Sequence, residues 1–226
     1  MAWTGRLLQR QCGANGLDIL RIGIDGGGAQ ARPGWLAEME SVTCPLMRSS
    51  PGEDWVEILA PADAWRWPVD TIRTLTPVSR HALTITTKHP FILAVGEGLG
   101  LAPVVFLSDL LRRNTNLQGT VFLGDRQGFP FQPAPSRIIV PHLPSHLIAT
   151  LPLLEDWHIA CRLALAGESP GCHQGPVCEL AATWLAGDKA RLPHVMVYAS
   201  GGDGFCDRMN RLCRQHSVAC QLMPLA

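Results

Sequence analysis

The sequence lacks an excess of charge of either sign, because 19 Lys and Arg balance 19 Asp and Glu among its 226 residues. Such a chain has no electrostatic footprint for a polyanion, so we expect no nucleic-acid partner and no binding to an anionic membrane surface. It also lacks an apolar run of the ~20 residues needed to span a bilayer, and its first residues, MAWTGRLLQRQCG, lack the apolar centre of a signal peptide. We therefore expect a cytoplasmic protein.

The cysteines are too sparse for a disulfide scaffold, and no two of the eight form a Cys-x-x-Cys pair. Cys172 and Cys178 flank His173, but a second ligand pair at zinc spacing is missing. A glycine-rich turn with incidental thiols is the stronger interpretation, and we expect no metal site. Cys206 and Cys213 lie seven positions apart on a predicted helix, hence on one face, which is typical of buried, unreactive thiols. The histidines form no spacing that suggests a catalytic pair, so no catalytic residue is predicted.

The N-terminal region, residues 1–87, reads as β structure without a long helix. Three segments are rich in β-forming residues: Leu17 to Asp25, Asp54 to Ala60, and His81 to Thr87. The glycine- and proline-rich stretch GGGAQARPG separates the first two. The sequence predicts a small antiparallel sheet or partial barrel.

From residue 88 onward, predicted strands alternate with predicted helices, which favours a parallel sheet covered by helices. The expected helices are Val104–Arg113, a short one within 145–156, Cys178–Ala186 and Phe205–His216, and the expected strands are Phe91–Val95, Thr120–Leu123, Ile138–Val140, His158–Leu165, His194–Ala199 and Val218–Leu222. Residues 124–136 are too rich in proline and glycine for a helix and are expected to form a long surface loop.

A glycine cluster follows the first strand of this region, in FILAVGEGLGLAPVVFLSDLLRR. Gly96, Gly98 and Gly100 precede a helix with Pro103 near its start, the layout of a strand, a turn and a helix. Backbone N–H groups at such a turn can receive a phosphate. The spacing is G-x-G-x-G rather than the G-x-G-x-x-G of the dinucleotide fingerprint, so a purely structural turn stays open as the alternative.

A second glycine turn, SGGDG at 200–204, follows a later strand and also precedes a helix. Ligands of parallel sheets sit at the carboxyl ends of the strands, so the two turns are expected to lie side by side and to open onto one crevice. Glu97 would repel a phosphate and is expected to face solvent. Asp203 can accept a hydrogen bond from a ribose or an amide, but a helix N-cap is the favoured interpretation. The predicted fold class is therefore α/β: a parallel nucleotide-binding sheet, residues 88–226, with a small N-terminal antiparallel β domain, residues 1–87.

These segments resemble the ferredoxin reductase superfamily, and within it the electron-transfer subunit of bacterial dihydroorotate dehydrogenase. VGEGLGLAP is similar to the family's GGGIGLAP turn, and VMVYASGGDG is similar to its last strand and CGPxPM turn, while FPFQPAPSRIIVP, PLLEDWHIACRLA and GCHQGPVCELA match between them. The resemblance covers roughly residues 88–224. It implies an NADH or NADPH site formed by Gly96, Gly98, Gly100, Leu101, Ala102, Pro103, Ser200, Gly201, Gly202 and Asp203.

The N-terminal stretch ARPGWLAEMESVTCPLMRSSPGEDWVEIL resembles the family's flavin domain, in which an R-x-[YF]-S pattern holds FAD. Ser49 occupies the place of that arginine, which argues against bound FAD. Arg48, one residue earlier, and Ser50 are the remaining candidates for a flavin phosphate, although a surface ion pair is as good an interpretation of Arg48. The family continues into a cysteine cluster beyond the place where this sequence ends at Ala226, so we expect no [2Fe–2S] centre.

Two functions follow from the resemblance. The first is an oxidoreductase or electron-transfer subunit that binds a nicotinamide nucleotide, uses a flavin and meets a redox partner subunit similar to dihydroorotate dehydrogenase. The alternative is a non-catalytic scaffold or regulatory protein derived from that electron-transfer subunit. Altered residues at three functional places favour the alternative, and the intact first glycine turn favours the oxidoreductase.

Overall fold

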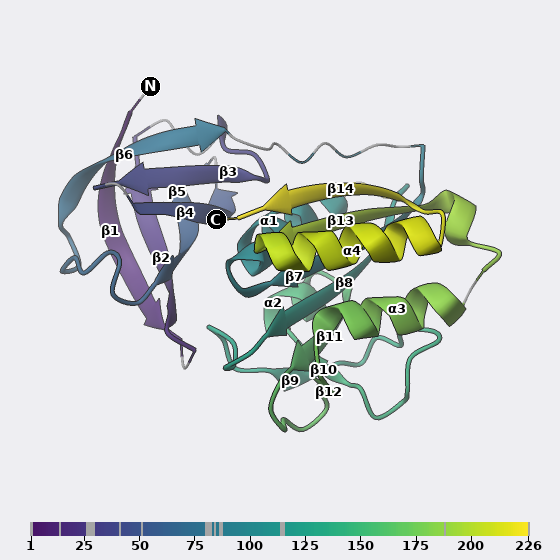
Figure 1. The fold of residues 1–226 in the computed structure, drawn as a ribbon. Helices are drawn as coiled ribbons and strands as arrows, with labels where there is room; N and C mark the ends of the chain where they lie inside the picture. Colours follow the sequence, from purple (N-terminus) through teal and green to yellow (C-terminus); the bar gives the residue numbers. More distant parts are fainter. Residues whose placement is uncertain are drawn as a thin grey trace.

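The computed structural model describes residues 2–13, 15–25, 30–40, 42–50, 52–79, 83, 85, 88–113, 116–187 and 189–225. The chain forms a β-barrel and a parallel sheet covered by helices, which lie side by side (Figure 1). Within the described residues, no helix is both long and apolar enough to cross a bilayer.

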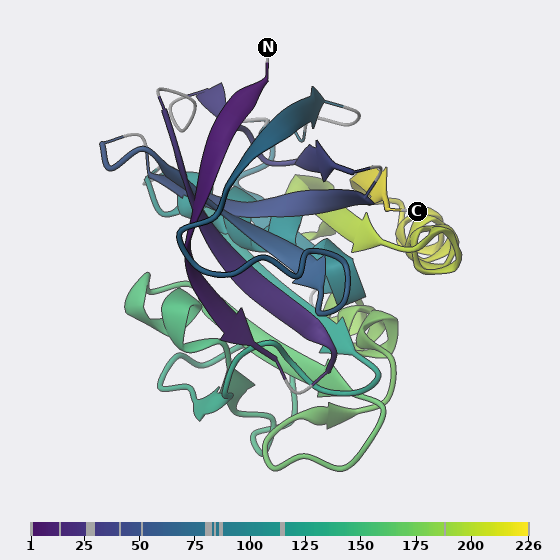
Figure 2. The same cartoon turned by 90° about the vertical axis from the view of Figure 1, so that its left-hand side faces the viewer.

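The barrel is closed by antiparallel pairing in the order β1-β2-β5-β4-β3-β6. Figure 2 views the molecule from the barrel side, with the strands crossing in front of the parallel sheet. The strands are β1 (Trp3–Cys12), β2 (Leu17–Ile24), β3 (Trp35–Met39), β4 (Val42–Ser50), β5 (Trp55–Pro61) and β6 (Ile72–Ser79).

Alternation along β2 shows why this region closes into a barrel. Leu20, Ile22 and Ile24 are buried inside it, whereas Ile19 and Arg21 between them are only partly covered. A strand places successive side chains on opposite faces, so one face can fill the barrel while the other stays outside.

The barrel forms one layer of the molecule, and the second layer is a parallel sheet in the order β12-β11-β8-β7-β13-β14. Its central strands are buried on both faces and are nearly continuous apolar runs, as expected for a parallel sheet between helices. The strands are β7 (Phe91–Glu97), β8 (Gln118–Asp125), β11 (Ala160–Leu165), β12 (His173–Gln174), β13 (Val195–Gly201) and β14 (Ala219–Pro224); β9 (Ala134–Pro135) and β10 (Ala149–Thr150) form a separate pair.

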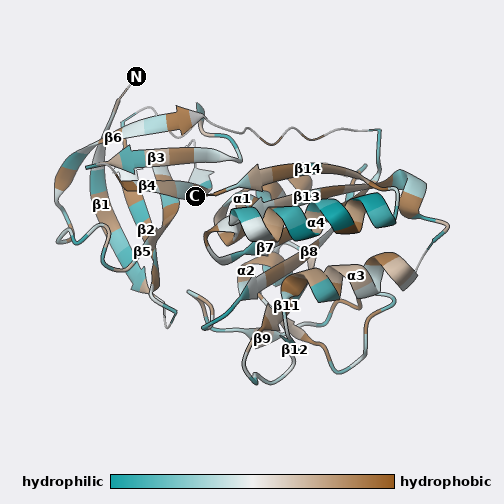
Figure 3. Ribbon diagram, in the orientation of Figure 1, coloured by the Kyte–Doolittle hydropathy of each residue, from teal (hydrophilic) through white to brown (hydrophobic). Residues whose placement is uncertain are grey.

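Helices cover both faces of the parallel sheet, with α3 and α4 on one face and α1 and α2 on the other (Figure 1). The outward side of α4 is mainly hydrophilic (Figure 3), and its opposite side buries Phe205, Cys206, Met209, Leu212 and Cys213. The helices are α1 (Leu101–Leu111), α2 (Pro152–Asp156), α3 (Val177–Gly187) and α4 (Asp203–Gln215), with 3-10 turns at Gly98–Gly100 and Leu192–His194.

Helix α1 joins the two layers, because it lies between the parallel sheet and the barrel. Every residue from Leu101 to Leu111 except Leu110 is buried, so this helix is apolar over most of its surface, and its buried polar residues are Ser108 and Asp109. Most of these side chains pack into the core beneath the parallel sheet, but Phe106 packs with the residues that fill the barrel. The division of the chain at residue 87 stays a prediction.

The predicted fold class is confirmed, and most predicted elements are found within a few residues. The strand expected at Ile138–Val140 is wrong: the backbone there pairs with no strand, and the Ile138 carbonyl accepts a hydrogen bond from Arg162 Nη2 at 2.6 Å. Most of the strand expected at His81–Thr87 lies outside the described residues, and the described Leu83 and Ile85 are not in a strand.

Both cysteines predicted on one face of the last helix are buried, with Cys206 6% and Cys213 0% exposed. Burial, with Cys220 beside it, raises the pKa of the Cys213 thiol to about 12. Burial of both thiols is confirmed, and their low reactivity stays a prediction, which the raised pKa of Cys213 supports because only a thiolate reacts readily.

Candidate functional site

The two glycine turns meet at the carboxyl edge of the parallel sheet. Strands β7 and β13 are neighbours, with Ser200 paired to Gly96, so the segments that follow them begin side by side. The expected adjacency of the turns is confirmed.

Two of the glycines are needed for the packing of backbone against backbone. A Cβ atom at Gly100 would stand 1.9 Å from the Ser200 carbonyl oxygen, and one at Gly96 would stand 2.7 Å from the Gly100 carbonyl oxygen. Side chains are therefore excluded at both positions by the protein itself. The structural interpretation of the glycine cluster holds for Gly96 and Gly100.

Two other glycines face open space. Gly98 has a φ of +59°, a conformation that costs little only for glycine, and a Cβ there would meet nothing within 4 Å. Gly202, the N-cap of α4, is equally open. These two backbone segments can approach a ligand, so the nucleotide interpretation rests on Gly98 and Gly202 rather than on the whole cluster.

Helix α4 begins directly after the second glycine turn. Asp203 was expected to cap the helix, but Gly202 is the N-cap and Asp203 is the first helical residue. The Asp203 carboxylate still complements the positive end of the helix, where it also competes with any bound anion.

Glu97 is not turned to solvent as expected. Its side chain is 21% exposed, and its Oε1 lies 3.3 Å from Nη2 of Arg208 on α4, so an ion pair ties the first turn to the second helix. The distance in sequence is 111 positions, which is why no local pattern predicts the pair. Arg208 Nη1 also lies near Gly204, at 3.7 Å from the position that a Cβ atom on Gly204 would occupy.

Four of the predicted site residues are buried behind the two turns. Leu101, Ala102 and Pro103 are buried at the start of α1. The Ser200 hydroxyl is fully buried and donates a hydrogen bond to the Met223 carbonyl at 3.1 Å. These side chains shape the turns, and they are not exposed to a ligand. Gly201 is also enclosed, since a Cβ there would stand 2.6 Å from the Phe205 ring.

On the barrel, Arg48 is held by a carboxylate that the sequence did not identify. Arg48 donates from Nε and Nη2 to the two oxygens of Glu57 at 2.5 and 2.6 Å, and Arg21 donates from Nε and Nη2 to Glu57 Oε1 at 3.1 and 2.8 Å. Burial alone would raise the pKa of Glu57, but the hydrogen bonds and charges of Arg48 and Arg21 outweigh it and hold this pKa below its usual value. Arg48 is thus ion-paired, but its partner Glu57 is buried, so the pair differs from the surface ion pair that one interpretation expected. Contact of Arg48 with a flavin phosphate stays a prediction.

Strand register explains this cluster. Gln9, Arg21, Glu57 and Arg48 are paired in a row across β1, β2, β5 and β4, all on the outer face of the barrel. A bulge in β4 adds Met47 to the same side, as bulges place two residues opposite one. The sequence could have indicated Arg21 and Glu57, because each is a charged residue inside a mostly apolar strand segment, LDILRIGID and DWVEILA.

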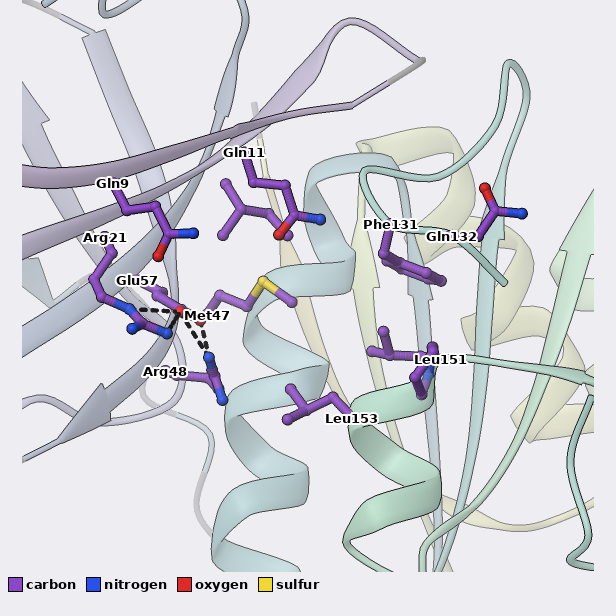
Figure 4. A pocket seen from close by; sticks show the side chains of 12 residues that line it. Gln9, Gln11, Arg21, Met47, Arg48, Glu57, Phe131, Gln132, Leu151 and Leu153 are labelled. Atoms are coloured by element: carbon purple, nitrogen blue, oxygen red, sulfur yellow. Dashed lines mark hydrogen bonds and ion pairs between the residues drawn. The ribbon is translucent and has the colours of Figure 1, made fainter. Parts of the chain in front are cut away.

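A cleft of about 350 Å³ opens over this row (Figure 4). The barrel forms one wall and the segment after β8, together with the start of α2, forms the other. Ser50 does not line it. The lining residues that sequence reasoning missed include Gln9, Gln11, Arg21, Glu57, Phe131 and Leu153.

The fold and the paired turns define the class of architecture as ferredoxin-reductase-like. Among solved structures, the chain is similar to the ferredoxin reductase in carbazole 1,9a-dioxygenase (16% identity, TM-score 0.72, 99% of this chain and 69% of that chain). It is also similar to the Amycolatopsis cytochrome P450 reductase GcoB (12%, 0.75, 99% and 69%). A third similar structure is the flavohem-like FAD/NAD-binding domain of the Vibrio cholerae nitric oxide dioxygenase (13%, 0.69, 99% of both chains). No family model and no curated protein sequence matches the chain.

Within the described residues, no group of three or more His, Cys, Asp or Glu side chains is placed to hold a metal ion. On β4, Ser49 follows Arg48, and the Arg48 guanidinium is bound on two nitrogens by Glu57. The expectation that FAD is not bound stays a prediction.

Proposed function

We propose that the chain is an oxidoreductase or electron-transfer subunit of the ferredoxin reductase type that binds a nicotinamide nucleotide across its two glycine turns. The observation that carries the proposal is the pair of open backbone segments at Gly98 and Gly202, side by side at the carboxyl edge of a parallel sheet with Arg208 next to them. That edge is where ligands of such sheets bind. Similar structures include a domain named for FAD and NAD binding.

A bound nicotinamide would supply the hydride chemistry, and the chain would supply binding and orientation. The backbone at Gly98 and at the start of α4 is suited to the pyrophosphate, because N–H groups at a helix N-terminus carry partial positive charge and no side chain stands at Gly98 or Gly202. Arg208 is suited to a second phosphate oxygen. Glu97 and Asp203 oppose the same negative charge, so we expect the affinity to be modest.

The Glu97–Arg208 pair provides a test of the proposal, because replacing one residue or the other should change the NADH affinity in opposite directions. Replacing Glu97 by Gln removes a negative charge and frees Arg208, so NADH should bind about three- to tenfold more tightly, whereas R208Q should weaken binding by a similar factor, on the scale of one partly exposed charged hydrogen bond. Calorimetric titration of NADH into each variant measures both changes.

Arg211, on the same helix and outside the pair, provides the control, and R211Q should leave the NADH affinity unchanged. If E97Q and R208Q shift the affinity in the same direction, or neither differs from R211Q, the paired glycine turns are not the nucleotide site.

Two observations support the non-catalytic alternative, a scaffold or regulatory protein derived from the dihydroorotate dehydrogenase electron-transfer subunit. Arg48 is paired with Glu57, and an acidic residue, Glu97, stands inside the first glycine turn. A chain that binds no NADH even as E97Q would favour this alternative. The redox partner expected for the first function, a subunit similar to dihydroorotate dehydrogenase, belongs to the proposal as well.

A further inference from the structure

The cleft between the barrel and the segment after β8 has its own chemistry, apart from the glycine turns. It shares no lining residue with 96–100 or 200–204. Its barrel wall carries the row Gln9, Arg21, Glu57 and Arg48, and its other wall carries Phe131 and Leu151 to Leu153 (Figure 4).

We propose that this cleft binds a small organic acid: one carboxylate, held by Arg21 and Arg48, attached to an aromatic or aliphatic body that lies against the apolar wall. The proposal does not depend on the nucleotide site, and it concerns a different ligand.

Charge is the first argument. Two guanidinium groups share one carboxylate, so the cluster carries one excess positive charge beside a partly enclosed cavity. Glu57 remains ionised at neutral pH because its arginine partners hold its pKa below the usual value. An uncompensated charge of this kind is matched by a single anionic group.

The geometry of the arginines is the second argument. Each guanidinium gives Nε and Nη2 to Glu57 and keeps Nη1 without a hydrogen-bond partner among the described residues. In Figure 4 one nitrogen of Arg48 is turned away from Glu57, on the side of the cleft where Leu153 lies. Both groups also stack on the Trp55 ring, 4.5 and 5.4 Å from its centroid, which fixes their orientation. Pre-oriented donors lose little freedom when they bind a carboxylate.

The apolar side of the cleft is the third argument. Ile19, Met47, Phe131 and Leu153 line it, and Phe131 stacks on Phe129 with ring centroids 5.1 Å apart. The wall is fastened to the barrel, since Gln11 Nε2 donates to the Pro130 carbonyl at 3.0 Å. An apolar body therefore meets a pre-formed apolar surface, which Phe131 and Leu153 form across the cleft from the arginines and which Ile19 and Met47 extend on the barrel wall.

Size and charge together separate this ligand from a dinucleotide. A volume of about 350 Å³ lies at the small end of the range of ligand pockets, roughly 300–1,000 Å³. A pyrophosphate carries two negative charges, whereas the cluster offers one excess positive charge. A single carboxylate with a ring or a short chain suits both limits.

The test uses 2-naphthoate as the probe and 2-naphthalenemethanol, its neutral analogue, as the chemical control, both titrated into the full chain by calorimetry. Naphthoate should bind at least about tenfold more tightly than the alcohol, because the alcohol forgoes the charged hydrogen bonds. R48Q should weaken naphthoate binding about tenfold, and F131A should weaken both probes. E57Q should strengthen naphthoate binding, an increase that a folding defect cannot imitate.

Arg73 on β6 provides the matched arginine control, because it too lies over a tryptophan ring on the barrel, at 6.0 Å from the Trp67 centroid, and does not line the cleft. R73Q should bind naphthoate as the unaltered chain does. Equal binding of the two probes, an equal effect of R48Q and R73Q, or weakening by E57Q would overturn the proposal. Displacement of naphthoate by FAD at a lower concentration than by a second small carboxylate would also overturn the proposal, since the cleft would then be a flavin site. NADH should not displace naphthoate.

Discussion

Replacement of Gly100 by alanine is expected to destabilise the folded chain by about 3 kcal/mol, at the upper end of the range for overpacking. The new Cβ would stand 1.9 Å from the Ser200 carbonyl oxygen, 2.3 Å from its carbon and 2.7 Å from the Gly201 nitrogen. All three are backbone atoms at the end of β13, which is paired on both sides, so no side chain can turn away to relieve the contact. Urea unfolding followed by circular dichroism measures the loss.

Two neighbouring glycines serve as controls for G100A. G202A should change the stability by less than about 0.5 kcal/mol, because Gly202 has an ordinary φ of −63° and open space around its Cα. G98A should cost about 1 kcal/mol through its positive φ alone. A G100A chain as stable as G202A would show that the two turns do not touch in solution.

The second large effect is expected at Phe106, where alanine should cost about 3–5 kcal/mol, the usual range for a buried phenylalanine. This side chain is 2% exposed and extends from α1 into the core of the barrel, although α1 belongs in sequence to the parallel-sheet region. Its loss leaves a cavity shared by the two layers. Because α1 packs on both, we expect tryptophan fluorescence and far-ultraviolet circular dichroism to report one common unfolding transition at a lower urea concentration.

Leu110, the one residue of α1 that is not buried, provides the comparison for F106A. L110A should cost much less than F106A and should keep the single transition. Two separated transitions in F106A, with the barrel melting alone, would show that α1 does not join the two layers as the structure indicates.

The elements that sequence reasoning identified are those with a local signal. Strands β2 and β5 alternate or run apolar over most of their length, helices α3 and α4 follow an apolar periodicity, and α1 is a nearly continuous apolar run. Each of these helices begins after a glycine or a proline. The apolar residues 138–140 led to a wrong strand prediction, because a strand also needs a neighbouring strand with which to form hydrogen bonds. Ile139 is 84% exposed, and only Val140 packs inward.

The barrel strands that were not predicted depend on long-range pairing. Strand β1 carries polar residues on its outer face and a bulge between Leu7 and Gln9, which interrupts its alternation, and it closes the barrel by pairing with β6 about 70 residues later. Strand β4 is likewise interrupted by its bulge. Closure of the barrel was therefore not visible in any window of the sequence.

The candidate site also has a part that could be predicted and a part that could not. The two glycine turns could be placed because each follows a predicted strand, and their adjacency could be predicted because turns that follow parallel strands lie at the same edge of the sheet. Which glycines pack and which stay open depends on atoms of the other turn, and the Glu97–Arg208 and Arg21–Glu57–Arg48 contacts join segments far apart in the chain. Ion pairs between segments that are distant in the sequence leave no pattern in any single stretch of residues.

The most direct measurement of the central proposal is a titration of the ¹⁵N-labelled chain with NADH, followed by the amide resonances of the two turns. The largest shifts are expected at Gly98 and at Gly202 to Gly204, whose backbone segments adjoin the open space, while Gly100 moves less because it is packed against Ser200. The row at Arg21, Glu57 and Arg48 should stay unchanged. Shifts confined to that row, or no shift at either turn at millimolar NADH, would contradict nucleotide binding at the paired glycine turns.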